Sequence, residues 1–146
     1  MRNKTLVILK PDAIQRNLVV NILSRLQRED LHISKMKIKW MDKPLTEKFY
    51  GHVKEKVVDQ RIFYNIVDYM GSTPLLFLVF EGNDVAKRVK MLAGATDPSK
   101  AAKGTIRGDF GIDTKEQADR ELRPVRNLIH ASDPEDAEKE IKMFFD

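Results

Sequence analysis

The sequence predicts an α+β fold in which helices pack on one face of a four-stranded antiparallel sheet. Three observations lead to this prediction. Two continuous apolar runs have the length of buried strands, and a further segment alternates strictly between apolar and polar residues. Between these segments, apolar residues recur at intervals of three and four, which is the period of an amphipathic helix.

Composition is typical of a soluble globular protein. The 146 residues are 42% hydrophobic and 33% charged, and domains of about 100–150 residues are common, so we expect residues 1–146 to form a single domain. The absence of cysteine excludes disulfides and thiol nucleophiles and suits a reducing cytoplasm. No apolar window approaches the roughly 20 residues of a membrane span, so we expect no membrane partner. The net charge of +4 suits anionic ligands such as nucleotides or nucleic acid.

The first part of the chain predicts two strands separated by a helix. Residues 5–10 form an apolar run that ends before Pro11, which lacks a backbone donor and therefore stops a strand. Residues 19–26 have the helical period, and residues 34–40 alternate, so we expect an amphipathic helix and then a half-buried strand. The alternation places Met36, Ile38 and Trp40 toward the core and Lys35, Lys37 and Lys39 toward solvent.

The middle of the chain predicts helices around a second buried strand. Residues 45–53 and 62–70 have helical spacing. Residues 74–82 form an apolar run of strand length that opens at a proline and closes at a glycine. A short helix over residues 84–92 follows.

The last part of the chain is less regular. Residues 93–122 contain four scattered glycines and one proline in a connection too long for a neutral linker, so we expect this loop to be functional. A short strand over residues 125–129 follows, and residues 132–135 carry the signals that start a final helix. The complete order of elements fits the β-α-β-β-α-β, ferredoxin-like arrangement.

His130 has the strongest chemical context of the three histidines. It ends an apolar segment and precedes a helix start, where free backbone donors and the helix dipole favour phosphate. An imidazole at this junction can act as a nucleophile toward a phosphoryl group, act as a general base, or only fill the end of a strand. We expect His32 and His52 at the surface, because both are surrounded by polar residues.

Arg107 and Lys10 are the candidate phosphate ligands. Arg107 lies in the segment Gly-Thr-Ile-Arg-Gly-Asp at residues 104–109, which either binds phosphate through its guanidinium and backbone or is an ordinary turn. Lys10 ends the first buried strand and points either to water or into a site at the strand end. The chain has no P-loop and no G-x-G-x-x-G fingerprint, so dinucleotide binding lacks support.

Four motifs follow one another in order along the chain. They are KPD at residues 10–12 with QR at 15–16, GATDP at 94–98, GTIRGDF at 104–110, and NLIHASD at 127–133 with AEKEI at 137–141. Together they closely resemble the nucleoside diphosphate kinase family over nearly the whole chain. The resemblance implies transfer of the γ-phosphate of a nucleoside triphosphate to a nucleoside diphosphate by a ping-pong mechanism.

The resemblance assigns a catalytic role to five residues. His130 matches the nucleophile, which carries the phosphoryl group as a pros-phosphohistidine. Glu140 is expected to orient the imidazole through one ring nitrogen and leave the other free, with Ser132 supporting the arrangement. Lys10 and Tyr50 match side chains around the phosphate and the histidine.

The resemblance also assigns nucleotide contacts. Lys10, Arg107 and Thr96 match phosphate ligands, and Asn127 matches the asparagine that meets the sugar. Mg²⁺ is the expected cofactor, held mainly by the nucleotide's phosphates and water and by no protein cage.

Two nucleotide contacts differ from the family pattern. Ile62 occupies the place of the aromatic residue that stacks on the base, with Phe63 beside it as the alternative. Lys90 occupies the place of a phosphate-binding arginine, with Arg88 as the alternative. A lysine keeps the charge but loses the bidentate fork.

Partners and rival functions follow from the same comparison. We expect a homo-oligomer, with a hexamer favoured over a tetramer. A nucleic-acid-binding module would need an RNP-like aromatic pattern that the chain lacks, so nucleic acid is not expected as the main partner. A catalytically inactive family member, acting as a structural or regulatory subunit, would lack the nucleophile or the phosphate cations. Here His130, Lys10, Tyr50, Arg107, Asn127 and Glu140 are all present.

Overall fold

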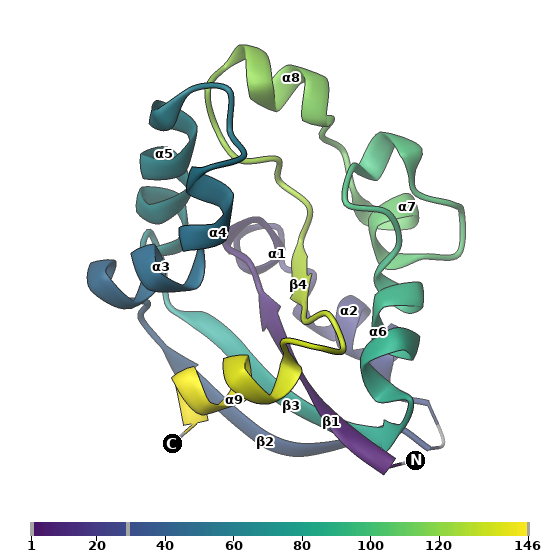
Figure 1. The fold of residues 1–146 in the computed structure, drawn as a ribbon. Helices are drawn as coiled ribbons and strands as arrows, with labels where there is room; N and C mark the ends of the chain where they lie inside the picture. The colour runs from purple at the N-terminus through teal and green to yellow at the C-terminus, as the bar shows by residue number, and fades with distance from the viewer. Residues whose placement is uncertain (1, 29, 146) are drawn as a thin grey trace.

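The computed structural model describes residues 2–28 and 30–145 and has the ferredoxin-like fold that the sequence predicts (Figure 1). One sheet has the strand order β2-β3-β1-β4, and each neighbouring pair is antiparallel. The strands are β1 (Arg2–Leu9), β2 (His32–Lys39), β3 (Leu75–Asn83) and β4 (Ile129–Ala131).

Helices form most of the remaining regular structure. Within residues 2–28 and 30–145, no helix is long and apolar enough to cross a membrane. The helices are α1 (Pro11–Gln15), α2 (Val19–Leu26), α3 (Lys43–Phe49), α4 (Gly51–Lys54), α5 (Gln60–Met70), α6 (Val85–Ala93), α7 (Ile106–Phe110), α8 (Lys115–Arg120) and α9 (Ala137–Phe145), with a 3₁₀ turn η1 (Pro98–Lys100).

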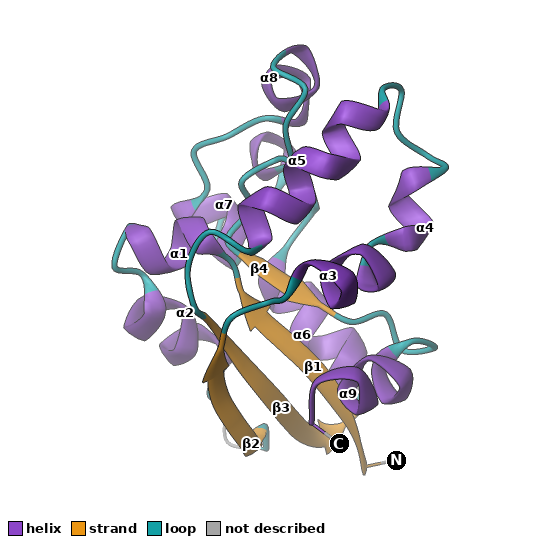
Figure 2. Ribbon diagram, turned by 90° about the vertical axis from the view of Figure 1, so that its left-hand side faces the viewer, coloured by secondary structure: helices purple, strands orange, loops and turns teal. Residues whose placement is uncertain are grey.

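The central strands β1 and β3 are buried on both faces, which explains their continuous apolar sequences. Along β1, Val7 and Leu9 pack with α2 and α6, whereas Leu6 and Ile8 pack with α3, α5 and α9. Helices therefore cover both faces of the sheet (Figure 2). The expectation of helices on one face is wrong, because a strand that is apolar on both sides needs a cover on each.

The edge strand β2 turns its apolar side chains toward solvent. Met36, Ile38 and the following Trp40 are 61%, 74% and 59% exposed, whereas Lys37 Nζ lies 4.7 Å from the ring centroid of Phe145 in α9. The predicted orientation of this strand is therefore wrong. Alternation distinguishes the two faces but does not say which face a helix covers, and a lysine stem can pack on an aromatic ring while its charge reaches water.

Boundaries of several elements shift by a few residues, and three segments differ from the prediction in the number or type of their elements. Residues 45–53 form two helices, α3 and α4, that meet at Tyr50. The predicted loop over residues 93–122 contains η1, α7 and α8. The last strand pairs with β1 only from Ile129 onward, because Leu128 has a φ of +73° and leaves the extended conformation.

Candidate functional site

His130 lies on β4 opposite Ile8 of β1, and its imidazole is bonded to a carboxylate of α9. His130 Nε2 is 2.9 Å from Glu140 Oε1. An ionised carboxylate only accepts hydrogen bonds, so Nε2 carries the proton and Nδ1 keeps a free lone pair. Ser132 Oγ donates to the same Glu140 Oε1. This chain of bonds fixes both the ring orientation and the tautomer.

The surroundings of His130 favour the neutral imidazole. Burial lowers the pKa of His130, the nearby charges of Lys10 and Arg107 lower it further, and Glu140 only partly offsets them. For Glu140, burial raises the pKa, but the hydrogen bonds and charge of His130 together with the bond from Ser132 lower it overall. At neutral pH the pair is therefore a neutral histidine beside a carboxylate.

Lys10 connects the end of β1 to the segment before β4. Its Nζ donates to Asn127 Oδ1 at 2.8 Å, and Asn127 Nδ2 donates to the carbonyl oxygen of Thr96 at 2.9 Å. Burial, with the charge of Arg107, lowers the pKa of Lys10 to about 7. Of the two alternatives for Lys10, the structure therefore favours the one that points into a site.

Arg107 is buried and joins three segments. Its guanidinium donates to the carbonyl oxygens of Asn127 at 3.1 Å, Gly94 at 2.9 Å and Ile129 at 2.6 Å. Burial lowers the pKa of Arg107 to about 10, so the group stays charged at neutral pH. Because a guanidinium has five N–H donors, two are left over from these three bonds.

The local sequence around Arg107 sets its position. Thr105 Oγ1 caps α7 by accepting from the backbone of Gly108 at 3.0 Å. A Cβ at Gly108 would lie 2.0 Å from the carbonyl oxygen of Ala102, so only glycine allows this close approach. Gly108 of the GTIRGDF motif thus serves packing at this turn, whereas Gly104 meets no neighbour and has a φ of +93°, a conformation that favours glycine.

Tyr50 lies at the junction of α3 and α4, with its hydroxyl buried. Among the described residues, this hydroxyl has no hydrogen-bond partner. Burial, with the charge of Glu140, raises the pKa of Tyr50, so the phenol is a neutral donor. A buried hydroxyl without a partner requires an explanation, and a bound ligand would supply its acceptor.

A cavity of about 230 Å³ brings five predicted site residues together, namely Lys10, Tyr50, Ile62, Thr96 and Asn127. The sequence did not predict the apolar wall of this cavity or its lining residues around α8, which lies between α5 and α7 (Figure 1). The helical spacing of residues 62 and 66 was the available signal for Ile66. The missed lining residues are Val53, Val57, Ile66, Tyr69, Met70, Lys115, Asp119, Arg123, Pro124 and Val125.

The two open alternatives have different surroundings. Ile62 lines the cavity, whereas Phe63 is 1% exposed and packs in the core with α3 and α9. Lys90 forms an ion pair with Asp133, three residues after the nucleophile candidate. Arg88, the alternative to Lys90, donates to both carboxylate oxygens of Asp30 at 2.6 and 2.7 Å. As expected, His32 and His52 are exposed.

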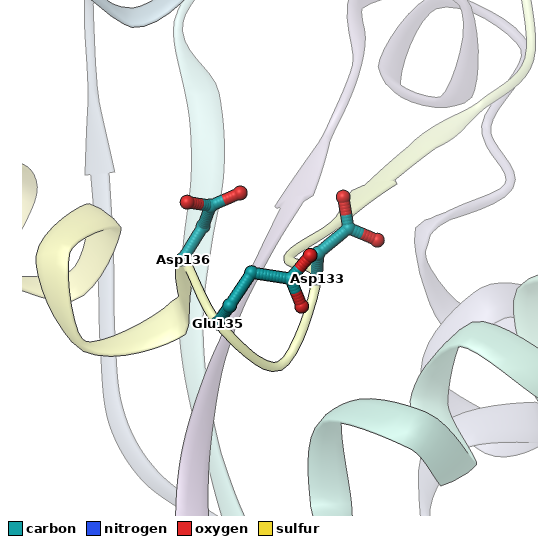
Figure 3. Close-up of side chains that lie close together, drawn as sticks. All are labelled: Asp133, Glu135 and Asp136. Atoms are coloured by element: carbon teal, nitrogen blue, oxygen red, sulfur yellow. The ribbon is translucent and has the colours of Figure 1, made fainter.

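Three carboxylates cluster on the turn that leads into α9 (Figure 3). Asp133, Glu135 and Asp136 are exposed, and their oxygens lie within 4.8 Å of one another. Asp133 is already paired with Lys90, and its carbonyl oxygen accepts from Asp136 and Ala137 to form the first turn of the helix. Acidic residues here complement the helix dipole, which accounts for the cluster.

The comparisons with known sequences agree with one another. A family model described as nucleoside diphosphate kinase matches residues 3–146. A nucleoside diphosphate kinase of Pyrococcus horikoshii is 44% identical over 143 residues, covering 97% of this chain and 84% of that protein. One of Streptomyces griseus is 43% identical over 148 residues, covering 99% and 97%.

Solved structures are similar over the same length. A transition state mimic of nucleoside-diphosphate kinase from Borrelia burgdorferi, with bound vanadate and ADP, has a TM-score of 0.91 at 31% identity, covering 99% of this chain and 88% of that one. An NDP kinase from Pyrobaculum aerophilum has a TM-score of 0.88 at 35% identity, covering 100% and 97%.

Proposed function

Since the chain belongs to the nucleoside diphosphate kinase family and is a phosphotransferase, we propose that His130 carries the phosphoryl group between two nucleotides. Nδ1 attacks the γ-phosphorus of a nucleoside triphosphate, and the bond to the bridging oxygen breaks, so the diphosphate leaves with the electron pair. A terminal oxygen of a second nucleoside diphosphate then attacks the same phosphorus. The P–N bond breaks and returns its electron pair to Nδ1.

One observation carries this proposal. The bond from His130 Nε2 to Glu140 Oε1 leaves Nδ1 as the unprotonated nitrogen, which makes the intermediate a pros-phosphohistidine. Glu140 and Ser132 orient the ring, and the carboxylate stabilises the positive charge that the ring gains as the P–N bond forms. The neutral state of His130 at neutral pH supports nucleophilic attack.

The cations and donors around His130 stabilise the transferring phosphoryl group. Phosphoryl transfer is catalysed mainly by positioning and charge, and Lys10, Arg107 and Tyr50 supply two positive charges and a neutral donor. Lys90 is a further cation toward the phosphates. Its pairing with Asp133 supports placing it, rather than Arg88, near the nucleotide.

The remaining contacts orient the nucleoside. We assign Thr96 to a phosphate and Asn127 to the sugar. Ile62 packs against the base within an apolar wall that includes Val57 and Ile66. An aliphatic wall without a fixed polar pattern suits broad tolerance of base identity.

Mg²⁺ enters with the nucleotide in this proposal. Among the described residues, the cavity is lined by one carboxylate, Asp119, and this side chain is paired with Lys115 at 2.9 Å. Such a donor set fits an ion held by phosphate oxygens and water. When bound, the ion neutralises phosphate charge, while Lys10 and Arg107 bind the phosphates and position them against His130.

We also propose that the protein is a cytoplasmic homo-oligomer, with a hexamer favoured over a tetramer. The free edge of β2 supports self-association, because it combines unpaired backbone groups with exposed Met36, Ile38 and Trp40. The choice of six subunits rests on the resemblance to the family. Residues 1–146 form its single domain.

Labelling with [γ-³²P]ATP and Mg²⁺ tests the role of His130. We expect acid-labile, alkali-stable label on the wild type and none on His130→Ala, and GDP should remove the label as GTP. His52→Ala is the matched control, because His52 is exposed, and it should label normally. Label that persists in His130→Ala would move the nucleophile to another residue.

A further inference from the structure

Leu128 has an unusual backbone conformation two residues before His130. Its φ is +73°, a value that residues with a Cβ rarely adopt. Its side chain is 0% exposed and packs in the core. Such a conformation persists only where the surroundings determine it, and here it lies between Asn127 and the strand that carries His130.

Asp12 and Lys10 hold both backbone polar groups of Leu128. The backbone N–H of Leu128 donates to Asp12 Oδ2 at 3.1 Å, and its carbonyl oxygen accepts from the backbone of Lys10 at 2.9 Å. Arg107 binds the carbonyl oxygens of the residues on either side. The end of β1 and the start of α1 therefore fix the segment that presents Asn127.

Tyr69 of α5 fixes the other oxygen of Asp12. Its hydroxyl donates to Asp12 Oδ1 at 2.8 Å and accepts from the backbone N–H of Asp12 at 3.0 Å. Burial, with the charge of Asp12, raises the pKa of Tyr69, so the hydroxyl keeps its proton as the donor. Asp12 is 6% exposed, and each oxygen of this buried carboxylate accepts a hydrogen bond, one from Tyr69 and one from Leu128.

Asp12 also supplies negative charge beside two buried cations. Burial lowers the pKa of Lys10, and the charge of Asp12 opposes that effect. Burial likewise lowers the pKa of Arg107, and the charge of Asp12 opposes that effect too. Lys10 and Arg107 in turn act on each other and on His130. Tyr50, Tyr69, Lys115, Asp119 and Arg123 are the other titratable side chains of the cavity that Lys10 lines.

We propose that Asp12 is a positioning residue of the phosphoryl-transfer site, which with Tyr69 holds Leu128 in its left-handed conformation and favours the protonated form of Lys10 that binds the phosphates. The inference rests on the proposed role of Lys10 as a phosphate ligand. Asp12 lies in the KPD motif, and this geometry gives the carboxylate of that motif a function. Neither Asp12 nor Tyr69 needs to touch the reacting atoms.

The test measures the dissociation constant of a nucleoside diphosphate for Asp12→Asn and wild type at two pH values. The asparagine keeps an acceptor for Leu128 but loses the charge. A loss of one pKa unit at Lys10, from about 7, would weaken binding about twofold at about pH 6 and about tenfold at about pH 8.5. A purely structural role would weaken binding equally at both pH values and would overturn the charge assignment.

Two further variants complete the experiment. Tyr69→Phe keeps the charge of Asp12 but removes its anchor, so binding should weaken a few-fold and equally at both pH values. Wild-type affinity in Tyr69→Phe would refute the proposal that Asp12 and Tyr69 hold the conformation of Leu128. This variant tests the proposal even where Asp12→Asn fails to fold. Asp68→Asn is the matched control, because Asp68 is an exposed carboxylate beside Tyr69 on α5, and it should bind as the wild type does. Binding is measured without turnover, so failure of the kinase assay and failure of this inference are distinct.

Discussion

At the scale of single residues, the site uses burial to set protonation states. His130, Lys10 and Tyr50 each have a pKa moved toward the neutral form, with burial as the largest cause. A neutral imidazole can attack phosphorus, and a neutral phenol can donate. Because the pKa of Lys10 is about 7, the negative charge of a bound phosphate shifts this side chain toward its charged form.

Glu140→Gln should slow phosphorylation of His130 about 10–100-fold, by analogy with the loss of a partner that orients a metal-bound histidine. A carboxylate only accepts, so it keeps the proton on Nε2. An amide can also donate, which permits the tautomer that carries the proton on Nδ1. Rapid-quench measurement of label from ATP reports this rate.

The matched control for this change is Glu138→Gln, an exposed position on the same helix. It should phosphorylate at the wild-type rate. A Glu140→Gln rate equal to that of the control would remove Glu140 from its orienting role.

Lys10→Met should abolish activity but raise the free energy of unfolding by up to about 4 kcal/mol at pH 6. The folded-state pKa of about 7 lies below the unfolded value of about 10.4. Below pH 7 the folded wild type therefore bears the whole cost of a buried charge. Between these two values the unfolded chain binds more protons, so wild-type stability rises with pH and the advantage of the variant shrinks.

Urea unfolding at several pH values measures this difference. The exposed Lys87→Met serves as the control and should leave stability nearly unchanged at every pH. A gain for Lys10→Met that does not depend on pH would contradict the role of burial.

At the scale of secondary structure, the turn between α1 and α2 depends on one residue. Asn17 has a φ of +56° and is exposed, and the backbone of Leu18 donates to the carbonyl oxygen of Ala13 at 2.9 Å to close the turn. Asparagine tolerates the left-handed region better than other residues with a Cβ.

Asn17→Val should lower the free energy of unfolding by about 1–2 kcal/mol, because a β-branched residue is strained at this φ. Asn17→Gly should be neutral or stabilising by a few tenths of a kcal/mol. The opposite response is expected at Asn21, an exposed residue inside α2. There a change to glycine should cost about 1 kcal/mol. Thermal and urea unfolding of the variants test the contrast.

At the scale of the whole molecule, the sheet of the described residues has a long edge strand, β2, and a short one, β4. β4 ends the other edge with only three residues, whereas β2 offers eight residues and exposed apolar side chains. Proteins protect long apolar edges by charge, by a cover or by pairing. In the homo-oligomer that we propose, the exposed face of β2 is the contact with a second copy of the chain.

Ile38→Lys should reduce the size of the oligomer by placing a charge in that contact, while the fold is kept. Sedimentation velocity measures the size, and circular dichroism checks the fold. Val58→Lys is the control, because Val58 is 89% exposed and lies outside β2. An unchanged sedimentation coefficient for Ile38→Lys would exclude β2 from the assembly.

The sequence by itself determined the strands β1 and β3, the helix α2 and the order of the four motifs. These features are local: burial on both faces gives a continuous apolar run, and an amphipathic helix gives a period of 3.6. Sequence context pointed to His130, Lys10 and Arg107, and the resemblance carried by the four ordered motifs added Glu140. The resemblance added the family, which the comparisons confirm.

Only the tertiary structure decided which face of β2 is buried, which nitrogen of His130 is bonded, and that Ile62 rather than Phe63 reaches the cavity. It also revealed Asp12 and Tyr69 as partners of Leu128. The physical reason is that each outcome depends on atoms far apart in sequence. Periodicity records that a residue has a buried side, whereas the neighbour that covers it is set by how the sheet and helices pack together.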